Sequence, residues 1–311
     1  MSGSMAAYTE LLALGGFFVL AADAVLFLWH ALRCRAKWTV LGFVSIAAVF
    51  LPLLLHHLPH LSDRKDKESR NLTLVAWNVD NFSLDRRCLE EMAVMVNAQD
   101  PDIICLQERP HDNLMKKDRI TEQFPDHPYT VCNDREDEVL NLMILSKYPL
   151  GNVRNHYFKD SYNKFMSVDV DVKDKELRLY NVHLQTTGIT DRAGSDLKEV
   201  LSSIIENASV RNNQADAVAE DIGTYEGKDI IVCGDFNSSV FSYSCQAVAR
   251  GMNDAAWKSP VALLQSSFLK SAAFPKIDHV FYAGAVECSD YSLTASPRSD
   301  HKMQKAVFKV W

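Results

Sequence analysis

The sequence lacks several features that would define a site or a class of protein. Its seven cysteines form no C-x-x-C pair, and its ten histidines show no H-x-H or H-E-x-x-H spacing. The first absence excludes a dithiol redox motif and a cysteine zinc site, and the second argues against a histidine-rich zinc site. The chain also has no long repeat, and after residue 70 no Gly/Ser-rich or Pro-rich stretch divides it. A single domain is therefore expected there.

An excess of basic residues is also missing. The chain has 33 Lys and Arg against 40 Asp and Glu, a formal net charge of −7. From Ser62 onward, 30 basic residues face 38 acidic ones, a net charge of −8. A tight, non-specific nucleic-acid binder carries a basic surface instead. A nuclease stays open, because metal ions in an active site can supply positive charge.

Charged residues are nearly absent from two long stretches near the N-terminus. Residues 11–32 contain only Asp23, and residues 38–58 contain none. A bilayer core about 30 Å thick needs about 20 apolar helical residues, so both stretches are predicted to cross a membrane as an anchor hairpin within residues 1–61. A signal peptide is disfavoured because no Lys or Arg precedes residue 11. A pair of buried core helices is the other alternative.

Basic residues beside these stretches predict an orientation. Arg33, Arg35 and Lys37 lie between the stretches, and the N-terminal tail has none. The positive-inside rule then places this connector in the cytoplasm and the rest of the chain outside. A basic cluster within residues 64–70 favours the opposite orientation. The prediction is a multi-pass membrane protein that contacts the lipid bilayer through residues 11–58 and has an extracytoplasmic C-terminal domain. No protein partner can be inferred.

After a charged linker at residues 62–71, β-rich runs alternate with helical patterns over residues 72–311. Several runs are almost continuously apolar, which is typical of strands covered on both faces. The run MSVDVDV (166–172) alternates instead, as a half-exposed strand does. One α/β domain of about 250 residues is within the normal range. Helices are predicted at 84–98, 194–223 and 242–250, and strands at 72–79, 102–107, 140–146, 166–172, 176–184, 229–236, 277–283 and 305–311.

Polar side chains stand where the apolar runs stop. Because strands of an α/β sheet deliver their C-terminal ends to one rim, these side chains are expected to meet there. Carboxylate and amide oxygens suit a hard cation such as Mg²⁺. Each residue alone could instead form a local turn, but six such sites are harder to explain as turns alone. They are Asn78, Glu108, His183, Asp235 with Asn237, Asp278-His279 and Asp300-His301.

Seven motifs surround these positions. In chain order they are WN (77–78), LQE (106–108), LSKYPL (145–150), YNVHL (180–184), GDFN (234–237), IDHVF (277–281) and SDH (299–301). Their order over residues 72–311 resembles the endonuclease/exonuclease/phosphatase superfamily, the DNase I-like group. The resemblance implies an α/β fold of four layers, with two mixed β-sheets packed face to face and helices outside. Ile277 and His279 depart from the basic and aromatic residues that often flank the aspartate of IDHVF in the family.

The resemblance also implies which residues bind metal and substrate. Glu108 would be the principal Mg²⁺ ligand, helped by Asn78 and Asp300, with Mn²⁺ as a substitute ion. Arg109 follows Glu108 and could contact substrate, although a solvated surface arginine is an equal alternative. Asn141 matches an amide often found at this place in the family and is a second substrate-binding candidate.

Five further residues would carry the chemistry that the resemblance implies. Asp235 would orient or deprotonate the attacking water, with Asn237 beside it on the phosphate. His301, held by Asp278, would contact a non-bridging phosphate oxygen. His183 would be a second imidazole on the phosphate. A carboxylate behind an imidazole raises its basicity, so that it can act on phosphate as a cation.

The leading prediction is a membrane-anchored, Mg²⁺-dependent phosphoesterase that hydrolyses a P–O bond by in-line attack of water. Phosphate esters repel nucleophiles, so the transition state needs charge stabilisation and a positioned water. The substrate stays open between nucleic acid, phospholipid and small phosphate esters. The alternative is a membrane-tethered binding or scaffold module with the same fold and no turnover. Loss of Glu108, Asp235, Asp300 or His301 would indicate that module, and none of them is lost.

Overall fold

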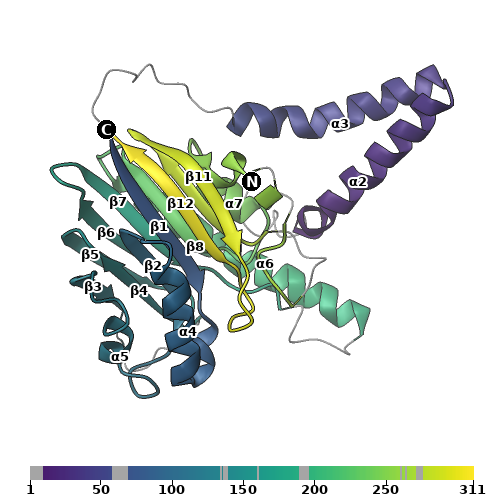
Figure 1. Cartoon of the computed structure of the whole chain (residues 1–311). Helices are drawn as coiled ribbons and strands as arrows, with labels where there is room; N and C mark the ends of the chain where they lie inside the picture. The colour runs from purple at the N-terminus through teal and green to yellow at the C-terminus, as the bar shows by residue number, and fades with distance from the viewer. Residues whose placement is uncertain are drawn as a thin grey trace.

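Two six-stranded β-sheets pack face to face in the computed structural model, which describes residues 10–57, 69–133, 135, 139–159, 161–188, 196–259, 261–262, 265–270 and 276–311 (Figure 1). The strand orders are β11-β12-β1-β2-β4-β3 and β5-β6-β7-β8-β10-β9. Each sheet contains one parallel pair, β1 with β2 and β7 with β8, and is otherwise antiparallel. The prediction of two mixed sheets is confirmed.

The strands of the first sheet are β1 (Arg70–Asn78), β2 (Ile103–Arg109), β3 (Tyr129–Cys132), β4 (Asn141–Ser146), β11 (Val286–Thr294) and β12 (Met303–Val310). Those of the second are β5 (Leu150–Tyr157), β6 (Lys164–Asp171), β7 (Glu176–His183), β8 (Ile230–Asp235), β9 (Asn253–Asp254) and β10 (Asp278–Ala283). The helices are α2 (Glu10–Leu32), α3 (Ala36–His57), α4 (Arg86–Asn97), α5 (Lys117–Thr121), α6 (Leu197–Thr224) and α7 (Tyr243–Val248), with 3₁₀ turns η2 (Asp80–Leu84) and η4 (Ala255–Lys258).

All eight predicted strands are present, and the four strands missed by the sequence are the four sheet edges, β3, β5, β9 and β11. An edge strand has neighbours on one side only, and its sequence need not be continuously apolar. In β5, for example, the six residues between Leu150 and Tyr157 are all exposed. Edge strands therefore leave a weaker pattern in the sequence than central strands do.

Alternate residues of the central strands face opposite layers. In β1, Leu72 and Leu74 lie in the core between the sheets, whereas Val75 and Trp77 lie in the core beneath α4. In β8, Val232 lies in the core shared with α6 and α7. The helices thus cover the outer faces of both sheets, which gives four layers. Strands buried on both faces explain the continuous apolar runs in the sequence.

The alternating sequence of strand β6 predicts a half-exposed strand, but the structure shows a buried one. Every residue from Lys164 to Val170 is buried. Two of its buried polar residues have partners within the protein: Lys164 Nζ donates to the Leu140 carbonyl at 2.8 Å, and Asp169 forms a buried ion pair with Arg178 of β7. Asp169, a polar position of the alternating run, is therefore paired beneath a covering layer instead of being exposed to solvent.

The N-terminal helices contradict the membrane prediction. In the part of the chain that the structure describes, no helix is both long and apolar enough to cross a membrane. The first turn of α2 packs on the domain instead, because Glu10 forms a buried ion pair with Arg211 of α6 at 2.8 Å. A carboxylate paired inside the protein marks a protein contact at the start of the predicted span. The multi-pass localisation is therefore wrong, and the transmembrane hairpin and the bilayer contact over residues 11–58 lose their basis.

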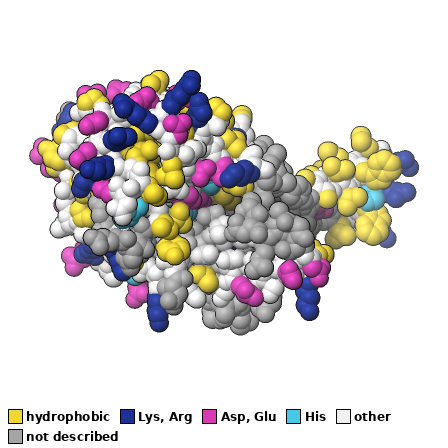
Figure 2. All heavy atoms as spheres, turned by 90° about the horizontal axis from the view of Figure 1, so that it is seen from below, with side chains coloured by type: hydrophobic (Ala, Val, Ile, Leu, Met, Phe, Trp, Pro, Cys, Tyr) yellow, Lys and Arg dark blue, Asp and Glu magenta, His cyan; other side chains and the backbone are white. Residues whose placement is uncertain are grey.

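Beyond this contact, α2 and α3 project from the two sheets (Figure 1). Hydrophobic side chains are exposed on the projecting part, with Lys and Arg at its tip (Figure 2). The tip is held by stacking of His30 on Trp38 at 5.7 Å and by Arg33, which lies 4.5 Å from the ring centre of Trp29. Of the predicted linker at 62–71, residues 62–68 lie outside the described residues.

Candidate active site

Four strand ends from the two sheets meet at one rim. Asn78 ends β1 and Glu108 lies near the end of its parallel neighbour β2, while His183 and Asp235 end the parallel pair β7 and β8. The Asn78 amide joins the two sheets, because its Nδ2 donates to Glu108 Oε1 at 2.9 Å and to Asp235 Oδ2 at 3.0 Å. Parallel strands deliver their C-terminal ends to the same edge, and this brings the predicted residues together.

A carboxylate–imidazole pair completes the rim. Strand β10 places Asp278 opposite Asp235 of β8. His301 lies in the segment before β12, and its Nδ1 is 3.0 Å from Asp278 Oδ2. Its Nε2 is 3.6 Å from Asp235 Oδ2. Trp77 Nε1 donates to the His301 carbonyl at 2.9 Å, so β1 fixes this segment against the first sheet.

The end of β8 and the turn that follows it have a backbone that only certain residues allow. Gly234 has φ of 139°, and a Cβ there would lie 2.0 Å from the carbonyl oxygen of Val182, so no other residue fits. Asn237 has φ of 51°. Its backbone N–H donates to Asp235 Oδ1 at 2.8 Å, and its side-chain amide donates to the Leu184 carbonyl at 2.9 Å. Asn237 therefore holds the Asp235 carboxylate in place.

A break in the pairing of β2 with β4 places the adjacent residues Glu108 and Arg109 in different surroundings. The β2–β4 register shifts between Leu106 and Arg109, and Glu108 has φ of 54° there. Glu108 lines the cavity, whereas Arg109 is fully buried and pairs with Asp112 at 2.5 Å. Asn141, opposite Arg109, is also fully buried. Neither of these two predicted substrate-binding residues lines the cavity.

The two histidines of the site differ in charge. Burial by itself would lower the pKa of His301, but Asp278 and then Asp235 outweigh it and raise that pKa to about 10. Burial lowers the pKa of His183 to about 4, although Asp235 opposes the shift. At neutral pH His301 is an imidazolium and His183 is neutral. His183 Nε2 lies 3.4 Å from Glu108 Oε1, and its Nδ1 has no hydrogen-bond partner among the described residues.

Burial, together with neighbouring carboxylates, raises the pKa of three carboxyl groups around the site. Burial raises the pKa of Asp235, with His301 opposing and Asp278 adding to the shift. Burial also raises the pKa of Glu108, and the charge of Asp300 adds to it. Asp80 follows the same trend through burial and then the charges of Asp300 and Glu108. Several carboxylates gathered around one point repel one another, and a bound cation would reduce this repulsion.

The donor set fits a divalent metal ion. Glu108, His183 and Asp235 offer ligand atoms within 4.8 Å of one another, and so do Asp235, Asp278 and His301. In the second group the imidazole is already bonded to Asp278. The first group adjoins Asn78, whose amide bridges Glu108 and Asp235. Of the three residues predicted as metal ligands, Glu108 belongs to this first group.

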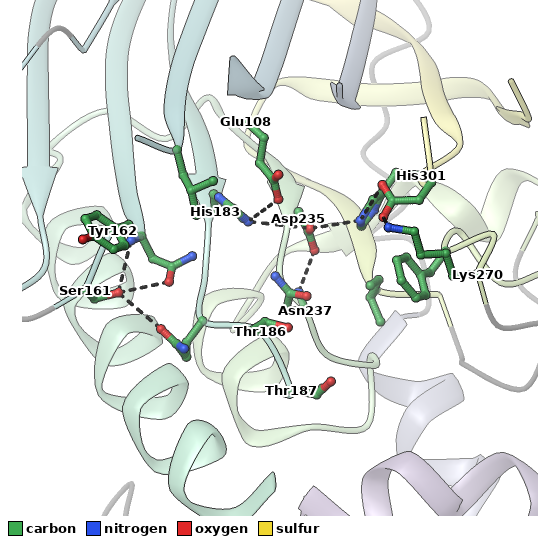
Figure 3. A pocket seen from close by; sticks show the side chains of 16 residues that line it. Glu108, Ser161, Tyr162, His183, Thr186, Thr187, Asp235, Asn237, Lys270 and His301 are labelled. Atoms are coloured by element: carbon green, nitrogen blue, oxygen red, sulfur yellow. Dashed lines mark hydrogen bonds and ion pairs between the residues drawn. The ribbon is translucent and has the colours of Figure 1, made fainter. Parts of the chain in front are cut away.

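A cavity of about 480 Å³ opens over these residues. Glu108, His183, Asp235 and His301 converge at its centre, with Ser161 and Tyr162 on one side and Lys270 on the other (Figure 3). Lys270 Nζ lies 2.6 Å from Asp300 Oδ2, and the Phe268 ring packs on His301 at 5.2 Å. Four of these residues were not predicted, because they lie in segments that carry no motif: Ser161, Tyr162, Phe268 and Lys270. The complete lining is Glu108, Leu140, Ser161, Tyr162, Asn163, His183, Gln185, Thr186, Thr187, Asp235, Asn237, Phe268, Lys270, Ile277, Asp300 and His301.

The fold and the site together define a class of α/β proteins in which two mixed sheets pack face to face and carry carboxylates and imidazoles at their joined strand ends. The chain belongs to the Endonuclease/Exonuclease/phosphatase family, whose model matches residues 75–301. The resemblance found in the motifs is thereby confirmed. Members of this family are phosphoester hydrolases that generally use a divalent metal ion.

Solved structures share the fold at low sequence identity. An endonuclease/exonuclease/phosphatase from Beutenbergia cavernae is 15% identical with a TM-score of 0.60, and the match covers 78% of this chain and 72% of that one. Truncated Caenorhabditis elegans TDP2 is 19% identical with a TM-score of 0.56, over 76% and 97% of the two chains. D. rerio TDP2, complexed with single strand DNA product, is 16% identical with a TM-score of 0.58, over 76% and 98%. No curated protein gives a significant match.

Proposed function

We propose that this chain is a Mg²⁺-dependent phosphoesterase that cleaves a P–O bond by in-line attack of water. The observation that carries the proposal is the position of Asp235. Its Oδ2 lies 3.0 Å from Asn78 Nδ2, 3.6 Å from His301 Nε2 and 3.8 Å from His183 Nε2, at the base of an open cavity. A carboxylate held among these groups can orient a water and accept its proton.

Three other polar residues at the centre of the site have a role in this proposal. His301, charged and held by Asp278, stabilises the negative charge that develops on a non-bridging oxygen. Asn237 holds Asp235 through its backbone N–H and lines the cavity, where it would contact the phosphate of a bound substrate. The neutral ring of His183 can donate a hydrogen bond to a phosphate oxygen without adding charge.

Glu108 is the proposed principal metal ligand, with Asn78 and Asp300 beside it. The fit rests on the donor chemistry, because oxygen ligands around a crowded, partly buried carboxylate suit Mg²⁺, and Mn²⁺ can substitute. A bound metal ion would supply Lewis acidity toward a phosphate oxygen. Asp300 also holds Lys270, which places one cation at the cavity rim toward an anionic substrate.

The substrate class is proposed as a phosphodiester or a phosphomonoester, with a nuclease-like or phosphatase-like activity. The D. rerio relative that carries a single strand DNA product supports testing single-stranded DNA first. The negative balance of the chain favours short or small esters over long nucleic acid.

Metal removal tests the proposal. We expect the full chain with Mg²⁺ to hydrolyse at least one member of a panel made of bis(p-nitrophenyl) phosphate, p-nitrophenyl phosphate, a single-stranded oligonucleotide and a phospholipid headgroup ester. EDTA should abolish this turnover, and Mg²⁺ or Mn²⁺ added in excess should restore it. Turnover that survives EDTA would contradict the metal dependence, and no turnover across the panel would contradict the hydrolase proposal itself.

A further inference from the structure

One wall of the cavity is held by a polar face of α6. Residues 185–187 line the cavity directly after β7. The backbone N–H of Gln185 donates to Gln214 Oε1 at 2.8 Å, and its side chain donates to Asn207 Oδ1 at 3.0 Å. Arg211 Nη1 donates to the carbonyls of Gln185 at 2.9 Å and Thr186 at 3.3 Å. Positions 207, 211 and 214 share one face of a helix, so α6 holds this wall through a single stripe of side chains.

The wall lies close against α6. Gly188 has φ of 72°, and a Cβ there would lie 2.5 Å from Asn207 Nδ2 and 2.9 Å from Ser203 Oγ. The chain therefore has little room to shift toward the helix, and its position depends on the groups that hold it. Among these groups, Arg211 is the only one that bonds to two consecutive carbonyls of the wall within the described residues.

Arg211 is in turn held by the N-terminal helix. Its Nη2 lies 2.8 Å from Glu10 Oε1, and both side chains are 0% exposed. The carbonyl of Ala13, one turn further along α2, accepts a hydrogen bond from Ser239 Oγ at 3.2 Å. Ser239 follows Asn237 in the turn after β8, so the first turn of α2 contacts both chain segments that border the catalytic groups.

We infer that Glu10 and Arg211 are positioning residues for substrate binding, and that the first turn of α2 is part of the structure that shapes the substrate cavity. A buried arginine that loses its carboxylate keeps an uncompensated charge and moves toward another partner or solvent. The carbonyls of Gln185 and Thr186 then lose their donor, and the wall moves. Asp235 and His301 belong to other elements, so the groups that carry the chemical step keep their positions.

The inference rests on the proposed function and is tested with the full chain. Glu10→Gln and Arg211→Met are each expected to raise KM for the best substrate of the panel by about tenfold, the size of one lost charge-assisted hydrogen bond. The value of kcat should change by less than about threefold, because the interaction lost acts on substrate binding. The double variant should raise KM no more than Arg211→Met alone, because the two residues act as one unit.

Two matched controls separate positioning from stability. Arg178→Met removes a buried arginine of another ion pair, at the far end of β7 from His183, and should lower Tm while leaving KM unchanged. Glu90→Gln removes the carboxylate of an exposed pair on α4 and should change neither. If Glu10→Gln and Arg211→Met lower Tm as Arg178→Met does and leave KM unchanged, the pair is only structural and the inference is wrong. If Arg211→Met alone raises KM, the part assigned to α2 is wrong.

A second measurement does not depend on turnover. The Gln185 amide, now bonded to Gln214, should exchange its hydrogen faster in Glu10→Gln than in the wild-type chain, when a peptide covering residues 184–188 is followed by mass spectrometry. Unchanged exchange at this peptide would overturn the inference. Absence of turnover in the wild-type chain would instead overturn the proposed function, and the exchange result would still stand.

Discussion

Asp235→Asn is expected to lower kcat by about 10³-fold to 10⁴-fold, because it removes the group proposed to accept the proton of the attacking water. The amide keeps nearly the same shape, so Asn78 and the backbone of Asn237 remain close to it. KM should change little. Steady-state hydrolysis of the best substrate of the panel at saturating Mg²⁺ measures the effect.

The stability of the same variant distinguishes a catalytic role from a structural one. The pKa of Asp235 is raised in the folded chain, so its ionised form at neutral pH opposes folding. A neutral amide removes this penalty, and Tm should stay level or rise while activity is lost. Asp171→Asn, at the exposed far end of β6, serves as the control and should leave kcat and Tm unchanged. Activity of Asp235→Asn within about tenfold of the wild type would rule out the assignment of Asp235 as the base.

His301→Gln is expected to lower kcat by about 10²-fold to 10³-fold, because it removes the positive charge that stabilises the negative charge developing in the transition state. The imidazolium at this position is stabilised by Asp278, which lies 3.0 Å from its Nδ1. Glutamine keeps a donor but has no charge. A wild-type level of kcat in this variant would exclude His301 from stabilising the transition state.

The pH profile of Asp278→Asn tests the same pair. Because the pKa of His301 is raised to about 10, the charged form persists across neutral pH, and activity that depends on it is lost only as pH rises through that value. Removing the Asp278 charge lowers the pKa of His301. The alkaline limb of kcat against pH should therefore move to lower pH in Asp278→Asn, and an unmoved limb would contradict the assignment.

The central strands and the residues at their ends could be predicted because burial leaves a strong pattern. Strands β1, β2, β7 and β8 are covered on both faces, so their sequences are rich in apolar residues, and a polar side chain stands at or near the end of each. Glu108, His183 and Asp235 stand at those points, and parallel pairing within each sheet brings their side chains to one rim. At this rim the residues predicted from the local sequence are the ones that the strand topology brings together.

Other features depend on contacts between distant segments. Arg109 follows Glu108 directly, yet a shift in register turns it into the interior, where it meets Asp112. Residues 11–32 have the composition of a membrane span, but the helix they form begins at Glu10, which is paired with an arginine 201 positions away. Neither outcome has a local signal, because each depends on a partner that the fold supplies.

The sequence by itself determined the family through its motifs, and the two-sheet α/β architecture followed from that resemblance. Buried strands and the polar residues at their ends left the short-range patterns from which the candidate site residues were predicted. Only the tertiary structure decided the charge of the two imidazoles, the cavity wall and the place of the N-terminal helix. His183 and His301 are both buried, and they differ because Asp278 is bonded to one of them. Charge and shape at the site arise from groups brought together across the chain, and residue order alone does not contain those distances.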